Sequence, residues 1–237
     1  MRDYLRVNEV QGAECAADAT PSHAALEGQI QQLESEIAQV AALDSLTVQQ
    51  KYLKIAYLRL DQGDAMAATA IAREVFTAAM ASMWWQEATE ACDVLFQAQE
   101  GNAAVKALAH GIWLGVTFPI DAELSVAMLQ HLIDETPDNA DGAAVAAAVA
   151  CYLVDLRVND TEKRDDLIFF TTQLLGQVAR RHSQIDEQEL FNFWVERMQL
   201  DDPTKFLPRL ATILDVLVAG DWWFDRDALR DLIPEEG

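Results

Sequence analysis

The chain has 237 residues, of which 51% are apolar, so it can bury a sizeable core as one large domain or two small ones. Its apolar residues are led by Ala and Leu, and only 10 Gly and 6 Pro interrupt it, a composition that favours helices. The net charge of −22 argues against binding to phosphate backbones or anionic membranes, and favours solubility and basic partners.

The first part of the chain predicts an arm followed by an amphipathic helix. Residues 1–21 mix charged and small residues without periodicity, which indicates a flexible N-terminal arm. In the helix that follows, apolar residues recur at spacings of three and four: Leu26, Ile30, Leu33, Ile37 and Val40. This stripe is either a face that packs on the rest of the domain or a dimer seam between two copies. Because about two heptads are short for an independent coiled coil, packing within the domain is favoured.

Helical periodicity continues through the rest of the chain, and short turns separate the elements. Helices are expected over residues 47–60, 65–82, 84–99, 103–116, 121–136, 140–158, 161–182, 186–200, 203–218 and 225–232. Short links favour antiparallel neighbours, so the predicted fold class is all-α, with antiparallel helical hairpins in a solenoid or a bundle. After the arm, we expect a hairpin region over 22–158 and a C-terminal helical region with an acidic tail over 159–237.

One stretch carries the pattern of a known helical repeat. Tyr52 stands where that repeat has a large aromatic, Ile55 and Ala56 stand for its leucine and small residue, and Ala68 lies where the second helix meets the first. Residues 50–75 thereby resemble a tetratricopeptide repeat (TPR), a helix–turn–helix of about 34 residues, although the later aromatic and the closing proline of the repeat are replaced. The resemblance implies a TPR-like array with a concave surface for a partner peptide or helix, and no catalysis.

The residues that usually carry chemistry are scattered. No two of the four histidines are three to five residues apart, so no helix presents a paired metal face: His23, His110, His131 and His182. The three cysteines form no CxxC pair and predict free thiols in a reducing compartment: Cys15, Cys92 and Cys151. No phosphate loop, HExxH or GxSxG motif occurs, and no Glu-x-x-His pair of a di-iron bundle. We therefore expect no catalytic residue, no metal and no cofactor.

Clustered aromatic residues give the candidate binding site. Neighbours on a helix diverge by about 100°, so the rings of Trp84 and Trp85, or of Trp222, Trp223 and Phe224, cannot all point into one core. These five residues are the predicted partner-binding residues, because such rings serve as interface anchors. The alternative is that residues 222–224 fold back and cover the last helix. A second set of rings is expected to build the C-terminal core: Phe169, Phe170, Phe191, Phe193 and Trp194.

The sequence thus predicts a protein that acts by binding another protein. An adaptor, assembly factor or accessory chaperone fits best, with a helical groove, exposed aromatics and acidic rims for a partner with a basic surface. We expect no nucleic-acid or membrane partner, and the sequence is compatible with a homodimer. The N-terminal residues lack an apolar signal core, which predicts a cytoplasmic protein. The alternative is an enzyme, or a cofactor- or metal-carrying helical protein whose site assembles from dispersed residues.

Overall fold

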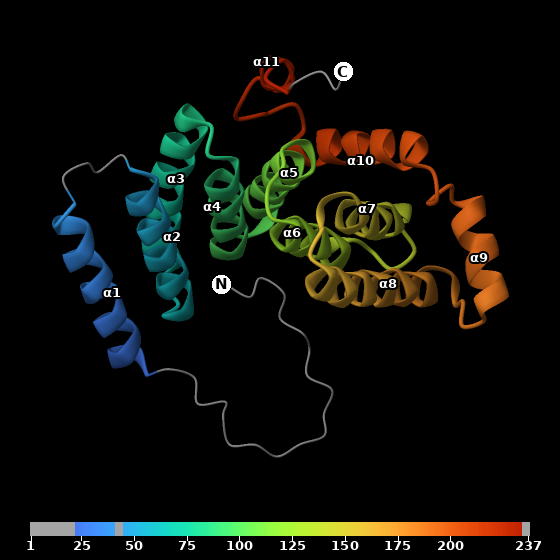
Figure 1. Ribbon diagram of the computed structural model, residues 1–237, viewed down its shortest axis with the longest axis horizontal. Coiled ribbons are helices and arrows are strands. Elements are labelled where there is room, and N and C mark those ends of the chain that lie inside the picture. The colour runs from blue at the N-terminus through green and yellow to red at the C-terminus, as the bar shows by residue number, and fades with distance from the viewer. Residues whose placement is uncertain (1–21, 41–44, 234–237) are drawn as a thin grey trace. The chain divides into compact units, whose positions relative to one another are not determined.

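The computed structural model describes residues 22–40 and 45–233, and over these residues it contains eleven helices and no strand. The all-α prediction is therefore confirmed. Contacts divide the chain into two compact units, residues 1–104 and residues 105–237 (Figure 1). The predicted arm over residues 1–21 lies outside the described residues. Among the described helices, none combines the length and the apolar character that crossing a membrane requires.

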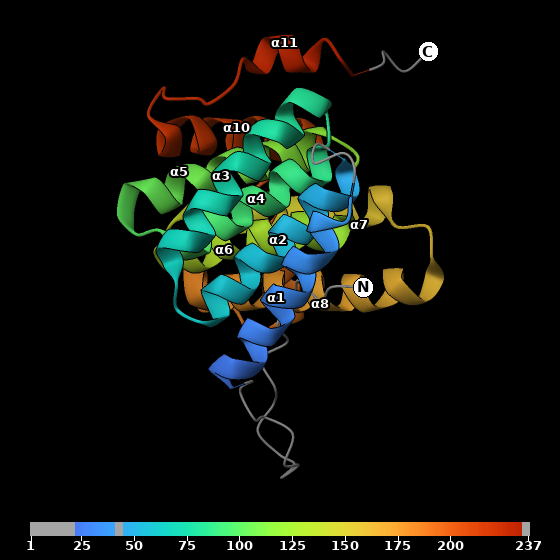
Figure 2. The same cartoon turned by 90° about the vertical axis from the view of Figure 1, so that its left-hand side faces the viewer.

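The first unit is a series of neighbouring helices. It contains α1 (His23–Ala38), α2 (Leu46–Asp61), α3 (Ala65–Ser82) and α4 (Trp85–Ala98). Each packs on the next, and α2 also contacts α4, as the view in Figure 2 helps to follow. Helix starts follow local chemistry, because the side chains of Ser22, Ser45 and Asp64 accept hydrogen bonds from backbone N–H groups of the turns they cap. Because Ser45 is the cap of α2, the helix begins at Leu46, one residue before the expected start at residue 47.

The predicted dimer seam on α1 is occupied within the chain. Ile30 and Ile37 are buried in one core cluster with Val48 and Ile55 of α2. Leu33 and Val40 are partly buried against the same cluster, and Leu26 is buried as well. While α1 is docked on α2, only parts of Leu33 and Val40 in this stripe remain exposed for a second copy.

The stretch that resembles a TPR forms a helical hairpin, α2 and α3. Gly63 takes a φ of +78° in the turn, a left-handed conformation that favours glycine. Ala68 and Ala72 are fully buried, so the two helices approach each other through small side chains. This geometry suits any close-packed helical hairpin, and membership of the repeat family stays a prediction.

The second unit is built around one alanine-rich helix. It contains most of α5 (Gly101–Thr117) and all of α6 (Ala122–Glu135), α7 (Asp141–Arg157), α8 (Thr161–Ser183), α9 (Gln188–Arg197), α10 (Pro203–Val218) and α11 (Arg226–Arg230). Helix α7 packs against α6, α8 and α10, and Figure 1 shows it between α8 and α10. Residues 143–150 are all buried, as expected of a helix that is apolar all round. The predicted boundary at Asn159 falls inside this unit, between two helices that pack together.

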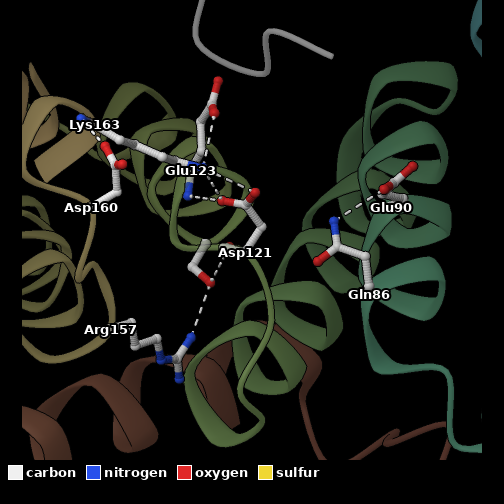
Figure 3. A network of polar contacts seen from close by, with 8 residues as sticks. Gln86, Glu90, Asp121, Glu123, Arg157, Asp160 and Lys163 are labelled. Atoms are coloured by element: carbon white, nitrogen blue, oxygen red, sulfur yellow. Dashed lines mark hydrogen bonds and ion pairs between the residues drawn. The ribbon is translucent and has the colours of Figure 1, made fainter. Parts of the chain in front are cut away.

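A half-buried arginine ties the end of α7 to the end of α5. Arg157 donates from Nη1 to the carbonyl oxygen of Gly115 at 2.6 Å and from Nη2 to that of Val116 at 2.7 Å. Figure 3 shows the guanidinium of Arg157, and nearby the ion pair of Lys163 with Asp121, which joins α8 to the start of α6. Burial lowers the pKa of Arg157, and the helix C-terminal carbonyls compensate by accepting its hydrogen bonds.

Candidate functional site

Helix α8 has two faces with different surroundings. Helix α8 packs on α7, and four of its five buried residues recur at spacings of three and four: Leu167, Thr171, Leu174 and Val178, with Ala179 beside the last. Phe169 follows Leu167 by two residues, a rotation of about 200° around the helix axis, so its ring lies on the opposite face. Accordingly, 65% of Phe169 is exposed. A large apolar ring therefore stands on the outer face of α8.

That outer face lines an open groove of about 570 Å³. The lining residues of α8 recur every three or four positions from Asp165 to Arg180, which corresponds to about 22 Å along the helix. The connection to α9 and one ring of α9 complete the groove. Its full lining is Asp165, Ile168, Phe169, Thr172, Gln173, Gly176, Arg180, Ile185, Asp186, Glu187, Gln188 and Phe191. This α8–α9 groove is long enough to hold several turns of a helix or a short extended peptide.

The prediction that five C-terminal rings build a core is wrong for two of them. Phe169 is 65% exposed and Phe193 61% exposed, whereas Trp194 is buried and Phe170 and Phe191 are half-buried. Helix α9 has only ten residues and buries one of them, so Phe193, about 100° from Trp194, faces solvent. The groove was missed because adjacent rings were assigned to one core. The two-residue offset of Phe169 from the buried stripe was the available signal.

The groove carries more negative than positive charge. Its lining has three exposed carboxylates, those of Asp165, Asp186 and Glu187, and one guanidinium, that of Arg180. Arg180 Nε lies 3.5 Å from Asp186 Oδ1, so the positive charge is paired within the lining. Asp165 and Glu187 form no ion pair with any residue in the described ranges. An apolar surface is thus bordered by two unpaired carboxylates.

Gly176 leaves the backbone of α8 open to the groove. In a helix interior, glycine costs about 1 kcal/mol relative to alanine. A Cβ at Gly176 would meet only Arg180 Nη2, at 3.8 Å, which is an ordinary contact. At Gly115, which is buried, a Cβ would also find only ordinary contacts, the nearest with Ser125 Oγ at 3.4 Å. Gly176 differs from Gly115 because it lines the groove, where a single side-chain atom lies within 4 Å of the added carbon.

The predicted aromatic cluster at the C-terminus packs on α5. The rings of Trp223 and His110 stack with their centroids 4.0 Å apart and an interplanar angle of 13°. Trp222 and Phe224 meet the edge of His110 at 5.0 Å and 5.4 Å, and Phe224 also lies 5.2 Å from Trp113. Trp222 and Phe224 are half-buried, and 41% of Trp223 is exposed. These rings therefore cover α5, and part of Trp223 remains open to a partner.

His110 joins this C-terminal segment, residues 221–233, to α5 by two hydrogen bonds. His110 Nδ1 lies 2.6 Å from the carbonyl oxygen of Lys106, and the backbone N–H of Trp223 donates to Nε2 at 2.9 Å. These partners assign the neutral tautomer with its proton on Nδ1. Burial lowers the pKa of His110 to about 4, although the hydrogen bond to the carbonyl of Lys106 and the negative charge of Asp221 act in the opposite direction. At neutral pH the imidazole is therefore an uncharged hydrogen-bond acceptor for the segment.

Charged contacts hold the same segment at its edges. Asp215 of α10 accepts from Trp222 Nε1 at 3.1 Å and pairs with Arg226 at 2.8 Å, and the guanidinium of Arg226 stands 4.1 Å from the centre of the Trp222 ring. Lys106 pairs with Asp221 at 2.7 Å, which lowers the pKa of that carboxyl. A few specific contacts thus hold the segment, since α11 itself buries no residue.

The other two predicted partner-binding residues, Trp84 and Trp85, belong to the first unit. They lie where α3 ends and α4 begins, after Met83 takes the left-handed conformation with a φ of +58°. Both are half-buried. Neither is fully exposed, and each keeps part of its surface open to solvent.

Metal-binding side chains do not gather at one place in the described residues. No group of three His, Cys, Asp or Glu side chains among them could hold one metal ion. Cys92 and Cys151 are free, and burial raises the pKa of both thiols, which disfavours the reactive thiolate. Cys15 lies outside the described residues.

Comparison with known proteins gives no family for this chain. Neither a protein-family model nor a curated protein nor a solved structure matches it.

Proposed function

We propose that this protein is a non-enzymatic binding protein that holds a segment of another protein in the α8–α9 groove. The observation that carries the proposal is the ring of Phe169, which is 65% exposed and lines an open groove of about 570 Å³. Its two nearest lining neighbours on α8, Ile168 and Thr172, extend this surface along the helix. An adaptor, assembly factor or accessory chaperone would use such a surface.

Physical reasons favour a polypeptide as the occupant. Exposed aromatic anchors commonly dominate the energetics of protein interfaces, and helical grooves accept segments that place apolar side chains at regular spacings. The groove is long, open and bordered by charges, whereas sites for small molecules bury most of their ligand in a concave cavity.

A peptide selection tests this proposal with a matched pair of variants. Peptides are selected from a random library on the immobilised wild-type protein, and their affinities are then measured for Phe169→Ala and Phe193→Ala. The two phenylalanines have similar exposure, 65% and 61%, but only Phe169 lines the groove. We expect selected peptides to bind Phe169→Ala at least about tenfold more weakly, because truncation of an interface anchor costs more than about 1.4 kcal/mol.

The control outcome is that Phe193→Ala binds these peptides like the wild type. The proposal fails if no peptide is enriched, or if the enriched peptides bind both variants and the wild type alike. Circular dichroism confirms that the two variants keep the wild-type helicity.

A further inference from the structure

The charge of the groove indicates the charge of its occupant. Asp165 lies at the first lining position of α8, and Glu187 lies on the connection to α9. Neither carboxylate is paired with another described residue, while Arg180 is paired with Asp186. An occupant with positive side chains beside its apolar face would meet both unpaired carboxylates. An acidic occupant would meet repulsion, which the total charge of −22 would increase.

The shape of the groove indicates that the occupant is helical. The lining positions 165, 168, 169, 172, 176 and 180 follow one face of α8 over about 22 Å, the length of a helix of about 15 residues. Gly176 lies within this stretch, and the described residues around it leave room for a Cβ. A position without a side chain lets a second backbone approach closely, as small residues do between packed helices.

On the basis of the proposed function, we propose that the occupant of the α8–α9 groove is a basic amphipathic helix. It lies along the outer face of α8, with an apolar side chain against Phe169 and its backbone nearest to α8 at Gly176. Its basic side chains pair with Asp165 and Glu187. Gly176 is therefore a specificity-determining position: it weakens α8 slightly and admits the partner helix.

The test uses designed peptides of about 15 residues and the full-length protein. One peptide has Leu on a single helix face and Lys elsewhere, a second replaces Lys with Glu, and a third scrambles the Leu/Lys composition so that no apolar face forms. Their affinities are measured by fluorescence anisotropy at low and at high salt. The protein variants are Phe169→Ala, Gly176→Ala, and Asp165→Asn combined with Glu187→Gln.

Each variant has a matched control outside the groove. Phe193→Ala controls for loss of an exposed ring, and Gly28→Ala controls for a glycine replaced in an exposed helix, where a Cβ would meet nothing within 4 Å. Asp61→Asn combined with Glu100→Gln removes the same charge from exposed positions in the first unit.

We expect the Leu/Lys peptide to bind at least tenfold more tightly than the Leu/Glu and scrambled peptides. Its affinity should fall about tenfold in Phe169→Ala and roughly three- to tenfold in the double carboxylate variant, with a weaker salt dependence in the latter. Gly176→Ala should also bind more weakly, while the three controls should match the wild type.

Two results would overturn the inference, and they separate it from the proposed function. Equal binding of the Leu/Lys and Leu/Glu peptides, both lost in Phe169→Ala, would refute the basic helix and retain the groove as a binding site. Equal binding of the Leu/Lys peptide by wild type and Phe169→Ala would show only a general attraction to an acidic chain and would also refute the inference. The proposed function itself then stands or falls with the peptides selected from the random library.

Discussion

Acidification is expected to destabilise the protein through His110. This side chain is fully buried, and its Nε2 accepts the backbone N–H of Trp223. Protonation of Nε2 would place a hydrogen where the acceptor lone pair now lies, so the charged imidazole would repel that N–H. The perturbation is a decrease in pH from neutral to 4, and the comparison is between the wild type and His110→Phe, which keeps an aromatic ring but cannot titrate.

The sign and size of the effect follow from the pKa. The pKa of His110 is lowered from 6.5 to about 4, so the unfolded chain binds the proton first as the pH falls. The stability that the neutral side chain contributes is complete above pH 6.5 and is lost between pH 6.5 and about 4. A pKa lowered by this amount corresponds to about 3 kcal/mol, a limit reached only if protonation requires unfolding of the whole unit. If protonation of His110 only detaches the C-terminal segment from α5, the loss of stability is smaller. It is then limited to the free energy with which that segment docks on α5.

Urea unfolding followed by circular dichroism measures this loss at a series of pH values. We expect the free energy of unfolding of the wild type, minus that of His110→Phe, to decrease steadily from pH 6.5 to 4. The difference cancels the titration of the many carboxylates that the two chains share, and the packing change in the variant gives a constant offset. A difference that does not change with pH would refute the reasoning.

Three further variants test single features of the second unit. Gly176→Ala should raise the thermal stability by about 0.5–1 kcal/mol, because alanine favours the helix and its added carbon has room. Arg157→Met should lower the urea stability by about 2 kcal/mol, because two carbonyl groups at the end of α5 lose their charged donor. Trp222→Ala combined with Trp223→Ala should leave helicity near that of the wild type, because α11 buries no residue, while limited proteolysis should cut the C-terminal segment faster.

Local features of the fold could be predicted because helix boundaries depend on nearby residues. Ser22, Asp64 and Asp202 have side chains of the type that caps helices, and each precedes a helix in the structure close to an expected helix start. The alanine-rich composition and the flanking turns also located helix α7, although they could not show that this helix would be buried between its neighbours.

The candidate site could not be predicted because it depends on which face each helix turns toward its neighbours. Phe169 and Phe193 resemble core residues in sequence, yet both are exposed, since α8 and α9 bury other faces. Conversely, His110 gave no signal in the sequence, because its partner Trp223 lies 113 positions away. Such contacts arise from tertiary packing, which local periodicity does not contain.

The central claim is that a polypeptide binds in the α8–α9 groove, and amide hydrogen exchange tests it most directly. A peptide selected on the wild-type protein is added at saturating concentration, and exchange is compared with that of the free protein. The account predicts slower exchange over residues 165–180 and 185–191, with little change in the first unit. Protection confined to other helices, with an unchanged groove, would contradict it.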